Sequence, residues 1–474
     1  MPRGVDAGCN GAHSSVRALC PPTRSGMWSG PPTIAPAMPS AKRCLPSTLF
    51  VWCTYIDLPV WEARVTASDR LFEEGVVECP HGYYRELREQ DPVHRVDDTD
   101  VFLVSRVDLI KEVAADPGRF SSRTSEFLHL DADGCIGLRP PMGPAGHDDE
   151  TPQILATADP PAHTRQRALL GRILSTTSIK ARENEFRELI DAALDPALSS
   201  GRVEWMGEIA EPLPMMMVTR LLGVADRHAA ALKEQGYAAV ELISGFVTEA
   251  DALTLEARLV ELGPAIEAFA AACRSATPDT STVAGVCARA VGDGVLDELE
   301  ALGTLAILLS AGGESTTSLL GSGARILAQR PDLQDSLRTD PTLIATFVEE
   351  VCRVEPPFRG HYRRVTTDTA LGGVALPTGS RLVLVWPAAN RGPGLGADEI
   401  DLNRPNPRQH VGFGWGLHLC VGAPLARMEA RVTLERLLAR TRSFAIEPGA
   451  QLRHHRSLMI RRLTALPLNL APAR

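Results

Sequence analysis

Apolar positions recur with a helical period through most of the chain. Amphipathic segments follow one another from His163 to Gln329, and two shorter segments before them, "HGYYRELREQ" and "VDLIKEVAAD", have the same period. The second of these is predicted to end at Asp116-Pro117, because proline has no backbone N–H to continue a helix. Another helix is predicted to begin at Ala423. The pattern therefore predicts a body whose middle is nearly all helix.

The two-residue period of strands is confined to short stretches. "VHRVDDTDVFLVSR" predicts a turn followed by a strand, and short strands separated by Gly and Pro follow Val354 in "TALGGVALPTGSRLVLVW". Residues 120 to 160 are predicted to form a loop. Together these elements predict an α+β fold class, mainly α with small β-sheets, built as one large unit.

The first part of the chain shows neither period. Residues 1 to 66 are rich in Pro, Gly and Ser, as in "SGPPTIAPAMPSAKR". Such a composition cannot bury enough apolar surface to offset the entropy that ordering the chain costs. We therefore predict a disordered N-terminal extension over residues 1–66 and one folded domain over residues 67–474.

Composition limits the partners and the cellular compartment that we expect for this domain. The chain has 474 residues and a net charge of −9, and because its first 50 residues are basic, the remainder is strongly acidic. An acidic body disfavours nucleic acid and anionic lipid as partners. Ten cysteines without a CxxC or Cys/His cluster argue against a disulfide framework or zinc site and for a reducing cytoplasm. No apolar stretch approaches the roughly 20 residues that a membrane span needs.

One cysteine, Cys420, stands in an unusual setting, the stretch "HVGFGWGLHLCVGAPLARMEA". Glycines precede and follow it, and Pro424 stands early in the next predicted helix, where its missing N–H costs nothing. Glycine lets a backbone approach a flat ligand that a Cβ would strike, and a thiolate can ligate a metal. Free N–H groups at a loop-to-helix junction can also bond the sulfur. A buried structural cysteine beside a glycine turn is the alternative interpretation.

The complete motif resembles the haem-binding signature of the cytochrome P450 superfamily, position for position: Phe413-Gly414-x-Gly416-x-His418-x-Cys420-x-Gly422. The resemblance covers roughly residues 70 to 470. It implies a P450 catalytic domain with heme b, iron protoporphyrin IX, bound between a long central helix and the cysteine loop. It also implies that Cys420 is the axial ligand of the iron. The residues of this motif that it implies are cofactor-binding are Phe413, Gly414, His418, Cys420 and Gly422.

Two further motifs resemble a structural ion network of the family. Glu350-Val-Cys-Arg353 looks like the family's E-x-x-R helix pair, and Asp401-Leu-Asn-Arg404 is similar to the segment whose arginine joins that pair. Glu350 and Arg353 are one helical turn apart, so their side chains can converge on Arg404 in a buried, mutually satisfied network. An E-x-x-R pair alone carries little weight, because such pairs are common on solvated helix faces.

The segment "DPPAHTRQRALL" resembles the family's C-helix motif. Its His163 and Arg167 lie four residues apart on one helical face, a spacing suited to two carboxylates on one porphyrin edge. The resemblance implies that both bind haem propionates. By the same resemblance Arg363, before a Gly-Gly turn, is a further propionate partner, with Arg364 as the alternative, and His418 is another.

The stretch "LLSAGGESTTSLL" is similar to the family's oxygen-binding groove. The resemblance implies that Glu314 and Ser315 form the acid–alcohol pair that relays protons. Ser315 replaces the usual Thr, so its rotamer is less fixed, which bears on the coupling of oxygen use to product. Thr316 could supply the hydroxyl only if the helix turned. In the alternative interpretation, Gly312 ends one helix and Ser315 caps the next.

The resemblance implies an oxidoreductase, a haem-thiolate monooxygenase that inserts one oxygen atom of O2 into a small-to-medium apolar substrate. Electrons would come from NAD(P)H through a ferredoxin reductase and a ferredoxin. A peroxide-driven haem-thiolate enzyme and a non-catalytic haem- or ligand-binding protein are the alternatives. An excess of arginine between residues 400 and 440 predicts a basic dock for an acidic ferredoxin. Its arginines are Arg404, Arg408, Arg427, Arg431, Arg436 and Arg440.

The walls of the substrate pocket are expected from residues 121–160, 237–247 and 308–316 and from the phrase "PFRGHY". Phe358 is the predicted apolar contact, and Arg359 is either an anchor for a carboxylate or a solvent-facing residue. Ala311 and Gly312 are expected to line the same pocket. Three phrases, "EWMGEIAEPLPMMMVTRLLGV", "AGGESTT" and "EPPFRGHYRRV", most resemble an actinobacterial, mycobacterial-type orphan subfamily.

Overall fold

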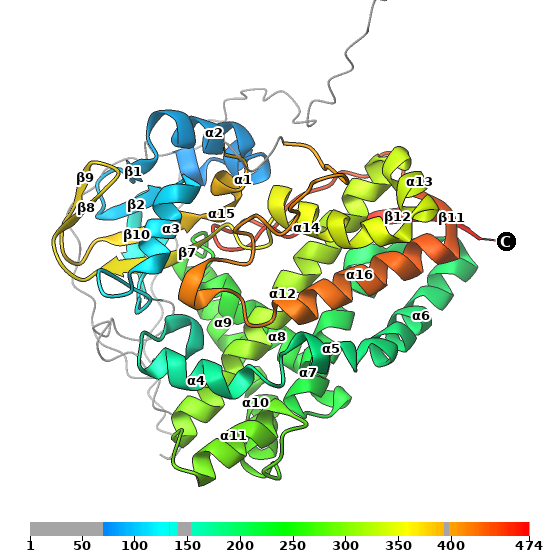
Figure 1. The fold of residues 1–474 in the computed structure, drawn as a ribbon, viewed down its shortest axis with the longest axis horizontal. Helices are drawn as coiled ribbons and strands as arrows, with labels where there is room; N and C mark the ends of the chain where they lie inside the picture. The colour runs from blue at the N-terminus through cyan, green and yellow to red at the C-terminus, as the bar shows by residue number, and fades with distance from the viewer. Residues whose placement is uncertain (1–69, 132, 141–152, 393–397, 474) are drawn as a thin grey trace, which may run out of the picture. The chain divides into compact units, whose positions relative to one another are not determined.

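A computed structural model describes residues 70–131, 133–140, 153–392 and 398–473. The predicted disordered extension, residues 1–66, lies outside this range. Helices dominate the described residues, as the apolar period predicts (Figure 1). They are α1 (Glu74–Glu78), α2 (His81–Gln90), α3 (Val107–Ala115), α4 (Ala162–Leu170), α5 (Thr176–Lys180), α6 (Glu183–Ser200), α7 (Pro212–Leu222), α8 (Ala229–Leu242), α9 (Glu249–Glu261), α10 (Gly263–Arg274), α11 (Val283–Gly292), α12 (Glu298–Gln329), α13 (Pro331–Thr339), α14 (Ile344–Val354), α15 (Trp386–Ala389) and α16 (Ala423–Arg440).

The strands form small sheets. A five-stranded sheet has the order β1-β2-β10-β7-β3, with β2 and β10 parallel and the other pairs antiparallel, and a three-stranded sheet has the order β11-β12-β6. The pairs β4–β5 and β8–β9 are separate hairpins. The strands are β1 (Val93–Arg95), β2 (Val101–Val104), β3 (Phe120–Ser121), β4 (Phe127–Leu130), β5 (Ile136–Arg139), β6 (Arg202–Glu204), β7 (Gly360–Val365), β8 (Thr369–Leu371), β9 (Val374–Leu376), β10 (Arg381–Val385), β11 (Thr441–Ile446) and β12 (Pro467–Pro472).

The long helix α12 organises the helical part. It begins in a capping box, in which Asp297 accepts from the N–H of Glu300 and the Glu300 side chain accepts from the N–H of Asp297. It packs against α7, α8, α11 and α16, and Figure 1 shows α16 running beside it. The largest group of buried apolar residues lies among these helices, and two smaller groups line the five-stranded sheet. A rigid helix is thereby held across the molecule.

The glycine pair in α12 does not interrupt the helix. The predicted alternative, in which Gly312 ends one helix and Ser315 caps the next, is wrong, because α12 is continuous from Glu298 to Gln329. A Cβ on Gly312 would lie 2.7 Å from Cγ2 of Val218, and one on Gly313 would lie 2.5 Å from Cε of Met215. The glycines therefore let α7 approach α12 more closely than larger residues would allow.

Three short stretches differ from the sequence predictions. The turn-then-strand stretch is a hairpin, β1–β2, and the predicted loop between residues 120 and 160 contains β3, β4 and β5. β6 interrupts the predicted helical middle, because Gly201 ends α6 with a left-handed φ of 73° and the chain then pairs with β12. Strands of two to four residues are too short to give a reliable alternation.

Candidate active site

The cysteine loop is shaped by glycines with left-handed backbone. Gly414 has φ +77° and Gly416 φ +68°, and a Cβ on Gly416 would lie 2.9 Å from the carbonyl oxygen of Ala114 at the end of α3. The Cys420 N–H closes the loop by donating to the Phe413 carbonyl at 2.8 Å. The sequence pattern of this loop thus corresponds to a tight turn packed against α3 that presents Cys420 just before α16.

The thiol of Cys420 is set apart from the other cysteines of the described residues. Cys273, Cys287 and Cys352 are buried and Cys135 is half-buried, whereas Cys420 is exposed. Desolvation by the protein around the sulfur raises the thiol pKa, while the backbone of Gly422 and the guanidinium of Arg167 lower it. An accessible sulfur at a helix start, supported by N–H groups and cations, can ligate a metal, which would itself hold the group as thiolate.

Four basic residues gather beside this loop. The rings of His163 on α4 and His418 stack with centroids 4.2 Å apart, and Nε2 of His418 lies 2.9 Å from Oγ of Ser122. Burial, then Arg363 and the neighbouring basic groups His163 and Arg167, lowers the pKa of His418 to about 2. The predicted residues His163, Arg167, Arg363 and His418 therefore form one basic cluster, although they come from three separate parts of the chain.

The structure distinguishes Arg363 from Arg364, the alternative candidate for the propionate partner. Neighbouring residues of a strand face opposite sides of the sheet, and it is Arg363 that shifts the pKa of both His163 and His418. Burial lowers the pKa of Arg363 itself to about 10, while Asp159 raises it. On β7, Arg363 is therefore the arginine that faces the basic cluster.

The cluster fits an acidic ligand. Asp159 is the carboxylate that acts on the pKa of His163 and of Arg363, and Nδ1 of His163 is buried without a hydrogen-bond partner. Buried cations repel one another unless anions balance them. Among the described residues, no group of three or more His, Cys, Asp or Glu side chains could hold a metal ion. A metal at Cys420 would therefore need to bring most of its ligands with it, and two carboxylates on that group would suit the cluster.

The predicted ion network is present. Arg353 donates from Nε to Oε1 of Glu350 at 2.7 Å and from Nη2 to Oε2 at 2.8 Å, and neither side chain is exposed. Nε of Arg404 lies 3.6 Å from Oε1 of Glu350, and the Asp401 N–H donates to Oε2 of Glu350 at 3.0 Å. The carbonyl of Glu399 accepts from Arg353 at 2.8 Å. The network fixes the chain before the cysteine loop to α14.

The predicted acid and alcohol on α12 bond to different partners. The Ser315 hydroxyl donates to the Ala311 carbonyl at 2.6 Å, one turn back on the helix. Ala311 is exposed and Gly312 and Ser315 are half-buried, whereas Thr316 is buried on another side of the helix. Ala311 and Ser315 therefore share an accessible face, and Thr316 does not belong to it.

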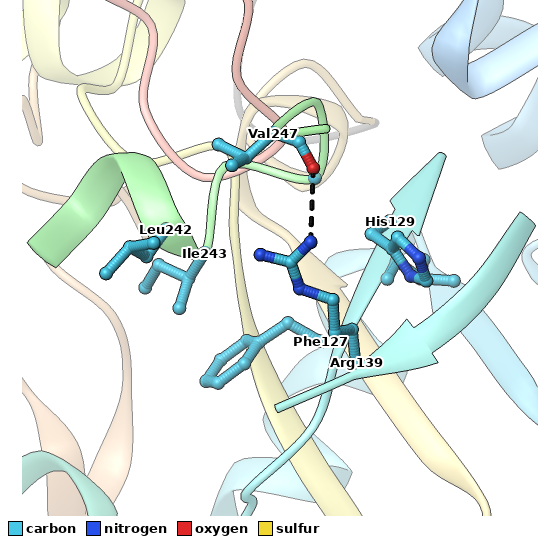
Figure 2. Close-up of a pocket in the computed structure, with 8 residues that line it drawn as sticks. Phe127, His129, Arg139, Leu242, Ile243 and Val247 are labelled. Carbon is cyan, nitrogen blue, oxygen red and sulfur yellow. Dashed lines mark hydrogen bonds between the residues drawn. The ribbon is translucent and has the colours of Figure 1, made fainter. Parts of the chain in front are cut away.

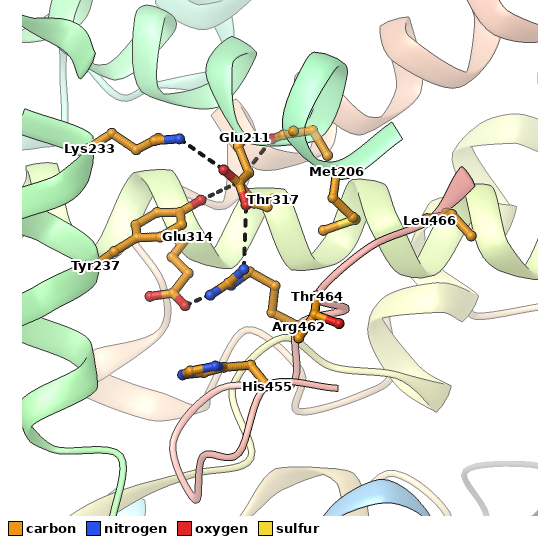
Figure 3. Close-up of polar contacts among 12 residues, drawn as sticks. Met206, Glu211, Lys233, Tyr237, Glu314, Thr317, His455, Arg462, Thr464 and Leu466 are labelled. Atoms are coloured by element: carbon orange, nitrogen blue, oxygen red, sulfur yellow. Dashed lines mark hydrogen bonds and ion pairs between the residues drawn. The ribbon is translucent and has the colours of Figure 1, made fainter. Parts of the chain in front are cut away.

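The carboxylate of Glu314 bonds to Arg462, a residue that the sequence reasoning missed (Figure 3). Nε of Arg462 donates to Oε1 of Glu314 at 3.0 Å, and its Nη1 reaches Oε1 of Glu211 at 3.4 Å. Lys233 bonds the other oxygen of Glu211 at 2.9 Å, and the Arg462 guanidinium lies 5.0 Å from the ring centre of Tyr237. The only sequence signal was an Arg-Arg pair in the apolar phrase "LMIRRL".

Burial and this ion pair act on Glu314 in opposite directions. Glu314 is 3% exposed and its Oε2 is buried without a hydrogen-bond partner. Burial raises the pKa of the carboxyl, and Arg462 lowers it. A carboxyl whose pKa lies above its ordinary value is closer to the range in which it can both accept and release a proton near neutral pH.

Arg359 does not fit either of its predicted roles. Its side chain is buried and donates from Nη2 to the Val77 carbonyl, 2.5 Å away, so it ties the start of β7 to α1 rather than facing substrate or solvent. Phe358 is half-buried, with its ring centre 4.8 Å from that of His361, beside the apolar residues that line the five-stranded sheet. Its contact with a substrate stays a prediction.

Two of the expected pocket walls meet (Figure 2). Residues of the β4–β5 hairpin and residues at the end of α8 line one small pocket, so parts of the predicted walls 121–160 and 237–247 face each other. The lining residues are Phe127, Leu128, His129, Arg139, Leu242, Ile243, Gly245 and Val247.

The arginines of the predicted basic dock are paired with carboxylates, and the dock stays a prediction. Arg427 bonds Glu349, Arg431 bonds Glu183 and Glu435, Arg436 bonds Asp191, Arg440 bonds Asp191 and Asp195, and Arg404 pairs with Glu350. Arg408 is 77% exposed but also lies 3.4 Å from Glu349. The excess of arginine within residues 400–440 is therefore balanced by carboxylates from α6 and α14, which a local charge count omits.

Comparison with known proteins agrees with this geometry. The family model for cytochrome P450 matches residues 287–458. Cytochrome P450 144 of Mycobacterium tuberculosis is 39% identical over 408 residues, which cover 85% of this chain and 91% of that protein. The chain belongs to the cytochrome P450 family. This P450 is also 31% identical to cytochrome P450 monooxygenase PikC of Streptomyces venezuelae, over 82% of this chain and 90% of PikC.

Solved P450 structures share the fold. The crystal structure of CalO2 aligns with a TM-score of 0.74 and 26% identity, over 86% of this chain and all of CalO2. The predicted α+β fold class and the mycobacterial-type resemblance are thus confirmed, and the protein is an oxidoreductase of the P450 monooxygenase class, a family that implies a haem cofactor. Among the described residues, the helices lack the combined length and apolarity that crossing a membrane requires.

Proposed function

We propose that this P450 binds heme b through Cys420 and catalyses insertion of one oxygen atom into a small-to-medium apolar substrate. The observation that carries the proposal is an accessible thiol beside a basic cluster. Arg167 connects the two, because it acts electrostatically on Cys420 and on His418. A porphyrin would supply metal ligands beyond the Cys420 sulfur and two carboxylates for the cluster.

The residues that would hold haem have separate tasks. Arg167 and Arg363 would pair with the propionates in charge-assisted hydrogen bonds, and the imidazoles of His163 and His418 would donate hydrogen bonds to them. Phe413, Gly414 and Gly422 would shape the loop around the Cys420 sulfur. Haem, when bound, would supply the oxygen-activating chemistry, and the Cys420 thiolate would hold its iron and tune its reactivity. The network of Glu350, Arg353 and Arg404 would hold the loop in place.

Glu314 and Ser315 would move protons on the α12 side. Glu314, which is hydrogen-bonded to Arg462, would hold the proton, and the Ser315 hydroxyl lies one residue further along α12 on the accessible face with Ala311. For transfer between them, the Glu314 carboxyl must leave Arg462 and the hydroxyl must leave the Ala311 carbonyl. Both rotamer changes are small compared with movement of the helix backbone.

Electrons are proposed to come from NAD(P)H through a ferredoxin reductase and a ferredoxin in the cytoplasm. Trp415 is 42% exposed and Leu419 47% exposed, and both lie in the cysteine loop. The Lys111 ammonium lies 4.2 Å from the centre of a Trp415 ring. An aromatic and an aliphatic side chain beside a cation make a small, mixed docking surface of the kind that transient partners use. This surface is proposed beside the predicted arginine dock.

Product analysis tests the function. Candidate ligands are first selected by the change they cause in the haem spin state, and each is then incubated with O2, NADH, a ferredoxin and its reductase. We expect product that carries isotope-labelled oxygen from O2 and that requires both partner proteins. Equal product from hydrogen peroxide alone would favour the peroxide-driven alternative. Spectral binding without product under either condition would favour a binding protein.

A further inference from the structure

Arg139, the last residue of β5, places a cation in a mostly apolar lining (Figure 2). Phe127 from β4 and Leu242, Ile243 and Val247 from the other wall surround it. Its guanidinium makes one hydrogen bond, from Nη1 to the Val247 carbonyl at 3.3 Å. Within the described ranges, Arg139 takes part in no ion pair, whereas the arginines of the predicted basic dock all do.

The hairpin that carries Arg139 connects the outer loop to the site. The Leu130 N–H donates to the Gly245 carbonyl at 2.9 Å, which fixes β4 to the loop after α8. The Leu128 N–H donates to the Tyr362 hydroxyl at 3.1 Å, and the rings of Phe127 and Tyr362 meet edge to face, 5.0 Å apart. β7, which carries Tyr362, also carries Arg363 of the basic cluster. Tyr362 and Arg363 are adjacent in β7 and face opposite sides of the sheet, so the hairpin and the basic cluster contact the two faces of one strand.

A second polar group stands beside Arg139. Nδ1 of His129 is buried without a hydrogen-bond partner. Burial lowers the pKa of His129 and Arg139 lowers it further, while the backbone of Gly137 and the carboxylate of Asp131 raise it, so the neutral imidazole is favoured. One charged donor and one neutral donor or acceptor thus converge among apolar side chains.

We propose that Arg139 anchors the carboxylate of an amphipathic organic acid, with His129 as a second contact, and that such acids are the substrate class of this P450. The proposal rests on the proposed function. A carboxylate accepts two parallel hydrogen bonds from a guanidinium and is a stronger acceptor than the single neutral carbonyl at 3.3 Å. The acid replaces the Val247 carbonyl, and its apolar part lies along Phe127 and Ile243.

The proposal moves the anchor from Arg359 to Arg139. Arg359 is bound to the Val77 carbonyl and is buried at the start of β7, so an acid cannot reach it without unfolding that contact. Arg139 is half-buried and its present partner is a loop carbonyl. Exchange of that weak bond for a carboxylate leaves the bond from the Leu130 N–H to the Gly245 carbonyl in place, so the hairpin stays fixed to the loop after α8.

Matched ligands and variants test the anchor. The holoenzyme is titrated with phenylbutanoate and with phenylbutanol, which share the apolar part, and binding is measured by calorimetry and by the haem spin state. We expect the acid to bind the wild-type protein about tenfold more tightly than the alcohol, and Arg139→Gln to weaken acid binding by about tenfold while leaving alcohol binding within about twofold. Arg95→Gln, which removes an exposed arginine on β1 that pairs with Asp100, should change neither.

Three results would overturn the proposal. The first is equal affinity of the wild-type protein for the acid and the alcohol. The second is equal weakening of both by Arg139→Gln, which would mean that Arg139 only holds Val247 in place. The third is an unchanged affinity of that variant for the acid. Failure of the proposed function would be recognised differently, because the purified protein would then lack the carbon monoxide spectrum of a thiolate-bound haem. If that spectrum is intact and the acid is not preferred, only the proposed role of Arg139 is refuted.

Discussion

Arg462 binds the carboxylate of Glu314, with Nε 3.0 Å from Oε1, although 148 positions of sequence separate the two residues. The bond joins the C-terminal segment to the middle of α12. The other oxygen of Glu314 is buried without a hydrogen-bond partner. The contact therefore leaves the carboxyl half satisfied, which is suited to a group that changes its protonation and its partner.

Replacement of Arg462 is expected to shift a pH profile. Arg462 lowers the pKa of Glu314 against the larger effect of burial, so Arg462→Gln should raise that pKa further. The limb of the pH profile that reports Glu314, measured as product formed per NADH consumed, should move to higher pH. Arg462→Lys keeps the charge and should restore the profile. Arg453→Gln, at an exposed position of the same segment, is the control, and an equal shift there would refute the assignment.

The two neighbouring arginines of β7 offer a matched pair for haem binding. Arg363→Gln removes a member of the basic cluster, and we expect haem to dissociate about tenfold faster, since one charge-assisted hydrogen bond is lost. Arg364→Gln, on the other face of the strand, should leave the dissociation rate within about twofold. The transfer of haem to apomyoglobin measures both rates. Similar rates in the two variants would contradict the placement of Arg363.

The glycines of α12 predict a packing effect. Gly312→Ala should lower the free energy of unfolding by about 1–3 kcal/mol, since the added Cβ would overpack the interface with α7. That Cβ would lie 2.7 Å from Cγ2 of the stiff Val218 side chain. Val218→Ala in the same chain should recover part of the loss. Gly75→Ala, where no atom lies within 4 Å of the added Cβ, should not destabilise the protein in the same denaturant titration.

A buried carboxyl in α16 predicts a pH-dependent stability. Glu429 is fully buried, neither of its oxygens has a hydrogen-bond partner, and burial raises its pKa well above the ordinary value. The folded state therefore holds the proton more tightly than the unfolded state does. Its contribution to stability is complete below the unfolded pKa and is lost as pH rises through the folded pKa. The free energy of unfolding, measured by urea titration from acidic to alkaline pH, should not show this decline in Glu429→Gln. An identical decline in the wild-type protein and the variant would contradict this assignment.

The parts of the site that lie within one local motif could be predicted from sequence. The loop around Cys420 is a run of glycines and a helix start, and the Glu350–Arg353 pair is one helical turn, so local spacing together with the family resemblance predicted both. The apolar periods likewise predicted the helical middle that contains α12 and the start of α16 at Ala423. In such cases, the interaction that stabilises the element is formed between neighbours in the chain.

The contacts that sequence could not predict join distant segments. Arg462 meets Glu314 only after the C-terminal segment has packed on α12, and Arg436 meets Asp191 only because α6 lies along α16. The carboxylate partners of the predicted arginine dock could not be foreseen for this reason. The β4–β5 hairpin escaped prediction because its position depends on the Tyr362 hydroxyl and the Gly245 carbonyl, which lie far along the chain.

The most direct test of the account concerns the bond between the Cys420 sulfur and the haem iron. Wild-type protein, Cys420→Ser and the control Cys352→Ser, which changes a buried cysteine, are purified, and haem content and the spectrum of the reduced carbon monoxide complex are recorded. We predict the red-shifted Soret band of a thiolate-bound haem in the wild type and in Cys352→Ser, and its absence in Cys420→Ser. That band in Cys420→Ser, or wild-type protein that binds no haem, would contradict the account.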